Sequence, residues 1–187
     1  ETGGDRVIND MERSIESQCL SLITRQQPIA GDLRMISAAL KVVTDIERIG
    51  DQTADIAELM LRLRDCDLDA YSRHITGMLQ VAKEIVHDAV GAFVNRDSRA
   101  ADEVIRHDDV VDELFAKVKD DLVHMLQEGV DNIDACVDVL MIAKYLERIG
   151  DHAVNIAEWE IFQESGAIQH IRLMSVSYTH LTLPTTP

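Results

Sequence analysis

The stretch DIERIGDQTADIAE, residues 45–58, recurs as LERIGDHAVNIAE at residues 146–158. The Glu of each copy, Glu47 and Glu147, lies 100 positions from its counterpart, and the Asp four residues later keeps the same offset. Apolar residues at three- and four-residue spacing run through both copies, which predicts that each lies on a helix. The chain is therefore predicted to contain the same helical unit twice.

The segment before each copy repeats as well. GDRVINDME and HDDVVDELF align with an offset of 103, which pairs Asp5 with Asp108 and Asn9 with Asp112. The repeating unit thus contains at least two helices, and both of them contribute acidic positions.

Composition favours helices and excludes several functions. Of the 187 residues, 46% are hydrophobic but only 4% are aromatic, and Gly and Pro are scarce; this mixture is typical of all-α proteins. A net charge of −16 argues against binding to nucleic acid or to an anionic membrane surface. Three scattered cysteines and the lack of a long apolar run predict a cytoplasmic protein without direct membrane insertion.

Helical periodicity appears in five segments bounded by capping and breaking residues. They cover residues 1–25, 33–63, 71–93, 98–127 and 133–163. Pro28 and Gly31 separate the first two, Asp97 or Ser98 caps the fourth, and Gly129 ends it. Asp69 is a plausible cap for the third, Asp131 or Asn132 for the fifth, and Gly166 follows the fifth. The first segment carries one apolar face of Val7, Met11, Ile15, Cys19 and Leu22.

The predicted fold is all-α, with two tandem antiparallel three-helix bundles, because short connections make neighbouring helices antiparallel. The first unit covers residues 1–64 and the second residues 69–165. The helix at 71–93 has no counterpart in the first half, so we expect the first bundle to be incomplete. Residues 175–187 contain no charged residue and are interpreted as a disordered, non-native tail.

Carboxylates share one face of the repeated helix. At about 100° per residue, Glu47, Asp51, Asp55 and Glu58 fall within a narrow sector, although the same line is apolar earlier in the helix. Like charges one turn apart repel each other, and the preceding helix adds further acids. The candidate site residues are Asp5, Asn9, Glu47, Asp51 and Asp55 in the first unit, and Asp108, Asp112, Glu147 and Asp151 in the second.

Two interpretations of these acids remain open. Oxygen ligands on facing helices suit Fe, Mn, Mg or Zn ions, whereas a solvated acidic face needs no ion. Gly50 and Gly150 sit inside the helices beside the acids, either for close helix packing or to leave room for an ion.

The doubled ERIGD, the segment RQQPIAGDLR at residues 25–34 and the NIAEW that closes the second copy resemble the PhoU family over roughly residues 1–165. The resemblance implies a pair of three-helix bundles, here without the family's first helix and the start of its second. It also implies metal ions at Glu47, Asp51, Glu147 and Asp151, with the acids of the preceding helix beside them. Asn9 against Asp112, and Asp55 against Asn155, break the symmetry and predict unequal sites.

The resemblance further implies a negative regulator of phosphate uptake and of phosphate-starvation signalling, and hence of transcription. Its partners would be the ATPase of the phosphate ABC transporter and a PhoR-type histidine kinase, and we expect a homodimer.

Two competing functions are considered. A ferritin-like di-metal oxidoreductase needs Glu-x-x-His on two helices; the chain offers Glu84 with His87 and the weaker Asp121 with His124, both outside the repeated row. A metal-free helical scaffold needs no site. No nucleophile or phosphate-loop motif occurs, so we expect no enzymatic activity.

Overall fold

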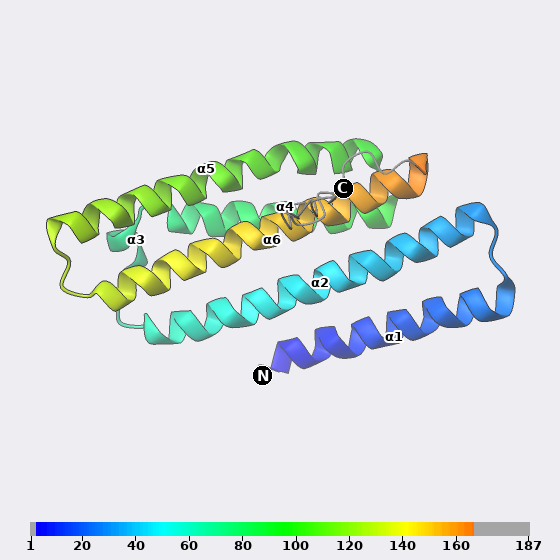
Figure 1. Cartoon of the computed structure of the whole chain (residues 1–187), viewed down its shortest axis with the longest axis horizontal. Coiled ribbons are helices and arrows are strands. Elements are labelled where there is room, and N and C mark those ends of the chain that lie inside the picture. The colour runs from blue at the N-terminus through cyan, green and yellow to red at the C-terminus, as the bar shows by residue number, and fades with distance from the viewer. Residues whose placement is uncertain (1–2, 167–187) are drawn as a thin grey trace, which may run out of the picture.

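The computed structural model describes residues 3–166, and within this range it contains helices and no strand (Figure 1). The side chains of residues 3–5 and of Asp69 lie outside the description, as do residues 175–187, on which the predicted tail falls. The helices are α1 (Gly3–Gln26), α2 (Ala30–Arg62), α3 (Leu68–Tyr71), α4 (Ile75–Asn95), α5 (Ser98–Glu128) and α6 (Ile133–Ser165).

The helices form two units that meet along α2 and α6. These two helices run antiparallel through the middle of the molecule, with α1 packed on α2 and with α4 and α5 packed on α6 (Figure 1). The second unit is a three-helix bundle, whereas the first consists of two helices among the described residues. This arrangement confirms the predicted all-α fold class.

Local sequence signals set most helix ends. The Asp97 side chain accepts hydrogen bonds from the backbone N–H groups of Arg99 and Ala100, and Asn132 accepts one from Ala135. Gly129 and Gly166 end α5 and α6 with φ angles of 89° and 69°, which glycine adopts without strain. All four residues were predicted as caps or stops.

The predicted helix 71–93 is wrong at its start. A separate turn of helix, α3, precedes α4, and the chain breaks at Ser72 between them. The Ser72 hydroxyl accepts from the His74 N–H at 3.1 Å and donates to Asp121 on α5 at 2.8 Å. The bond to the His74 N–H competes with the helical ladder, so α4 begins at Ile75 with His74 at its N-cap position, and position 69 lies within α3.

The hydrophobic core is centred on α6, because this helix contacts α2, α4 and α5. Leu146, Ala153, Ile156 and Ala157 on α6 are almost completely buried. Ala153 and Ala157 let the neighbouring helices approach closely, while Leu146 and Ile156 fill the space between them, as dense packing requires.

By contrast, α1 packs on α2 alone, and much of its predicted apolar face remains exposed. Cys19 is buried, but Val7 is 52% and Met11 60% exposed. In the second unit Val118 and Leu122, at the positions equivalent to Ile15 and Cys19, are buried within the complete bundle.

A buried polar cluster joins the two units across the contact between α2 and α6. Asp45 Oδ1 lies 2.8 Å from His152 Nδ1 and accepts a hydrogen bond from Asn155 Nδ2 at 3.1 Å. The side chains of His152 and Asp45 are only 7% and 14% exposed. One carboxylate of the first unit therefore satisfies two polar groups of the second.

We predict that Asp45→Ala lowers the free energy of unfolding by about 2 kcal/mol, because it leaves two largely buried donors without an acceptor. Asp55→Ala on the same helix removes an exposed carboxylate and should change stability by less than about 0.5 kcal/mol. Urea unfolding followed by circular dichroism measures both variants. Equal effects would show that the cluster does not stabilise the contact.

Candidate functional site

The acidic helices of each unit meet at a glycine. A Cβ atom built on Gly50 would lie 2.9 Å from Ile8 Cδ1, and one built on Gly150 would lie 3.4 Å from Val111 Cγ1. Ile8 and Val111 are 103 positions apart, the offset already found in the sequence. The two units therefore pack their acidic helices in the same way.

The second unit gathers most of its predicted site residues. Asp108 is 8% exposed, and its Oδ1 lies 2.9 Å from the position that a Cβ of Gly150 would occupy. Desolvation, together with the charges of Glu147 and Asp112, raises the pKa of Asp151, while Lys144 and His152 oppose the shift. Asp112 of α5 thus acts electrostatically on the acids of α6, as facing rows require.

The first unit shows the same facing arrangement with a different residue. Partial burial, then the charges of Glu47 and Glu16, raise the pKa of Glu12 on α1. The Asn9 amide oxygen, also on α1, is buried without a hydrogen-bond partner. Asp51 is half-buried, and the Asp5 side chain lies outside the described residues. The comparison of repeats did not indicate Glu12, because the equivalent position in the second unit is Phe115, which is not acidic.

Asp55 lies apart from the facing carboxylates of the first unit. It is exposed one turn beyond Asp51, whereas its counterpart Asn155 turns towards Asp45 on α2. The two units therefore differ at this position in environment as well as in charge.

The carboxylates are compatible with a cation but are not arranged as a ligand set. Glu47 lies 3.7 Å from Arg48, and Glu147 is paired with Lys144. Within the described part of the chain, no three His, Cys, Asp or Glu side chains converge in metal-binding geometry. The donors nevertheless fit a hard cation in kind, because they are carboxylate and amide oxygens and the Asn9 oxygen is buried without a hydrogen-bond partner. Binding would require side-chain rotation, and it remains a prediction.

The alternative di-metal motif has no structural support. The His87 side chain is 87% exposed and pairs with Asp88, not with Glu84. His124 is exposed, and Asp121 accepts the Ser72 hydroxyl. Neither Glu-x-x-His-like pair enters the bundle interior that such an enzyme uses.

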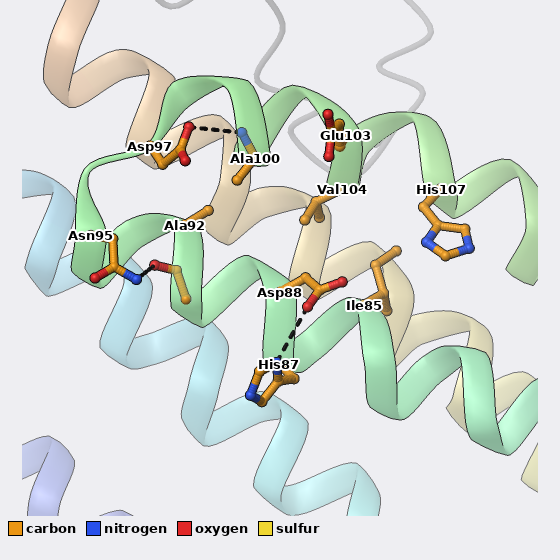
Figure 2. Close-up of a pocket in the computed structure, with 11 residues that line it drawn as sticks. Ile85, His87, Asp88, Ala92, Asn95, Asp97, Ala100, Glu103, Val104 and His107 are labelled. Atoms are coloured by element: carbon orange, nitrogen blue, oxygen red, sulfur yellow. Dashed lines mark hydrogen bonds and ion pairs between the residues drawn. The ribbon is translucent and has the colours of Figure 1, made fainter.

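A cavity of about 390 Å³ lies between α4 and α5, and none of the predicted site residues lines it. Figure 2 shows three of its polar groups bonded to near neighbours: Asp97 caps α5, Asn95 donates to the Gly91 carbonyl, and Asp88 pairs with His87. Three acids and two histidines line it without Lys or Arg. This lining does not favour a phosphate anion.

Glu160 is a buried carboxyl group that the sequence did not single out. It is 0% exposed, Gln163 donates to its Oε2 at 3.1 Å, and its Oε1 has no partner. Desolvation and the nearby Glu164 charge raise its pKa to about 7; Asp97 adds to the shift and Arg96 opposes it. The spacing of apolar residues in this part of the sequence does not predict that Glu160 is buried, since a Glu near a helix end normally lies in solvent.

Comparison with known proteins agrees with the repeat. The PhoU domain family matches residues 3–60 and 75–159. The phosphate-specific transport system accessory protein PhoU homolog of Clostridium acetobutylicum is 37% identical over 163 residues, which cover 87% of this chain and 74% of that protein. The homolog of the same name from Aquifex aeolicus is 39% identical over 173 residues, with coverage of 90% and 78%.

Solved structures show the same architecture. The crystal structure of PhoU from Pseudomonas aeruginosa matches with a TM-score of 0.79 and 34% identity, over 87% of this chain and 78% of that one. The phosphate transport system regulatory protein PhoU from Streptococcus pneumoniae has a TM-score of 0.82 at 24% identity, which supports the fold alone. Across residues 3–166, no helix has the length and apolar character needed to cross a membrane.

We predict opposite effects for two glycine substitutions inside helices. Gly91→Ala meets nothing within 4 Å and should raise the free energy of unfolding by up to about 1 kcal/mol through helix propensity. Gly150→Ala meets Asp108 and Val111 and should instead lower it by about 1–2 kcal/mol. Chemical unfolding of both variants measures the difference. An equal gain at the two positions would contradict the close contact between α5 and α6.

We also predict that Glu160 makes stability depend on pH. Its proton is held more tightly in the folded chain, so its contribution is complete below the ordinary pKa of 4.5 and is lost as pH rises to about 7. The loss is on the order of 1.4 kcal/mol per pH unit over that window. Glu160→Gln should flatten this part of the stability profile, measured by urea unfolding from pH 4 to 8, while Glu164→Gln should not. Parallel profiles for wild type and Glu160→Gln would contradict the prediction.

Proposed function

Because the chain belongs to the PhoU family, we propose that it is an accessory protein of phosphate-specific transport that damps phosphate uptake and starvation signalling when phosphate is abundant. The observation that supports this most directly is the group of relatives named for that transport system, which are 30–39% identical over most of the chain. The doubled acidic face, present in both units at equivalent positions, is the feature of this chain that agrees with them.

We propose the transporter's ATPase and a PhoR-type histidine kinase as partners, with the chain acting in the cytoplasm as a non-catalytic homodimeric adaptor. An adaptor needs extended surface more than a deep pocket. The long helices supply such surface, and the cavity between α4 and α5 lacks the basic groups that would hold phosphate. Control through protein contacts is therefore better supported than direct phosphate binding by this cavity.

We further propose that each acidic row holds a metal ion such as Fe, Mn, Zn or Mg. In the second unit Asp108 and Asp112 from α5 would act with Glu147 and Asp151 from α6; in the first, Asp5 and Asn9 would act with Glu47 and Asp51. Desolvation, with the charges of Glu147 and Asp112, raises the pKa of Asp151, and a bound cation would favour its ionised form. Because the ligands would come from two helices, the ion would link these helices to each other.

We predict that deletion of the encoding gene, in the organism that carries it, leaves phosphate-starvation genes expressed when phosphate is plentiful. The loss of a negative regulator should raise a starvation-promoter reporter in high phosphate to near its starved level, and restoring the gene should return it to baseline. A gene that encodes the Gly91→Ala variant is a suitable control for the restoration, because a Cβ atom at position 91 meets no neighbour and the variant should restore repression. A deletion strain with normal repression would contradict the proposed function.

A further inference from the structure

Both two-helix turns carry exposed apolar residues at their tips. We call residues 20–41, around the turn between α1 and α2, the first tip, and residues 123–141, around the turn between α5 and α6, the second tip. The exposed apolar side chains are Leu20, Leu22, Ile29 and Leu33 in the first tip, and Val123, Leu126, Ile133, Val137 and Met141 in the second. They are from 39% to 78% exposed.

Leu22 belongs to the apolar face of α1 described above, whereas Leu20 and Leu33 do not. Leu20 and Leu33 are equivalent to Val123 and Ile133 at the offsets of 103 and 100. Val123 and Ile133 remain 45% and 59% exposed even though the second unit has its third helix. These positions of the second tip therefore stay exposed in a complete bundle, and exposed apolar side chains gathered at one end of a molecule are typical of an interaction site.

The two tips carry opposite charges. The first tip contains Arg25, Arg34 and Lys41 against a single acid, Asp32. The second contains four acids, at positions 128, 131, 134 and 138, and no Lys or Arg. Asp138 pairs with Arg62 at the end of α2 at 3.3 Å, which leaves the acids at positions 128, 131 and 134 to give this tip its negative charge. The reversal occurs at equivalent positions, since Arg25 corresponds to Glu128 and Arg34 to Asp134. Similar apolar shape with opposite charge is complementarity within one chain.

The tips lie at opposite ends of the elongated molecule (Figure 1). When two copies lie antiparallel about a twofold axis, the first tip of each faces the second tip of the other, and the same contact forms twice. This is a closed isologous arrangement, the commonest kind of oligomer. A parallel pair would instead bring tips of like charge together.

We propose that the partner of these surfaces is a second copy of this chain, bound antiparallel so that the basic first tip of one copy packs on the acidic second tip of the other. The inference rests on the homodimer in the proposed function and adds the surface through which it forms. The complementary charges also offset the repulsion between two chains that each carry −16.

Charge reversal tests the arrangement at exposed positions. One variant reverses the first tip (Arg25→Glu with Lys41→Glu), another the second tip (Glu128→Arg with Asp131→Arg), and a third combines all four changes. All four side chains are exposed. Sedimentation velocity across a concentration series measures the dimer dissociation constant, and circular dichroism verifies folding. The matched control reverses two exposed charges elsewhere, Lys83→Glu and Asp102→Lys.

We expect each single-tip variant to weaken the dimer at least about tenfold, since both contacts then oppose like charges. The combined variant should recover to within about threefold of the wild type, and the control should not change. If the single-tip variants weakened the dimer only because they damage the fold, combining all four changes would not restore dimer affinity.

Three results would overturn the inference. A chain that is monomeric at every concentration contradicts both this surface and the proposed homodimer. A dimer that neither reversal weakens contradicts the surface alone. If the combined variant is weaker than either reversal, the tips do not face each other. In the last two cases, loss of dimer on Val7→Ser with Met11→Ser would assign the contact to the exposed face of α1.

Discussion

The close approach of paired helices at Gly50 and Gly150 is the constraint on which the acidic faces depend. With no side chain at these positions, α1 reaches α2 through Ile8, and α5 reaches α6 through Val111. The same approach sets Asp108 against the backbone of α6 and brings Asp112 within electrostatic reach of Asp151. Repulsion among these carboxylates opposes the helix contact, so packing of the apolar residues must offset it.

Much of the fold could be predicted from the sequence because its determinants are local or repeated. Asp97, Asn132 and the two terminal glycines act on neighbouring backbone groups, and they marked helix ends correctly. The doubled ERIGD motif fixed which helices are equivalent. The break at Ser72 was missed because its partner Asp121 is 49 residues away. Asp45 and His152 were missed for a similar reason, since their contact joins the two units and has no counterpart in either repeat.

The candidate site was predictable as a pair of rows but not in its detail. The spacing of Glu47 and Asp51 placed them on one face, and the structure sets Glu12 of α1 near Glu47. That neighbour could not be found by comparing repeats, because the second unit has Phe115 there, under the Lys144 ammonium group. Likewise Asn155 serves the contact between units rather than the acidic row. The units share a framework and differ in the charge they place on it, which predicts unequal affinities for a cation.

Metal binding at equilibrium tests the central claim, that facing acidic rows form two cation sites, most directly. The purified chain, stripped with a chelator and dialysed against Mn²⁺ or Fe³⁺, would be analysed for bound metal by mass spectrometry. The account predicts two classes of site, one lost in Glu47→Gln with Asp51→Asn and the other in Glu147→Gln with Asp151→Asn. Glu84→Gln with Asp88→Asn, which removes exposed acids of α4, should leave both. No bound metal, or the same stoichiometry in all variants, would contradict the claim.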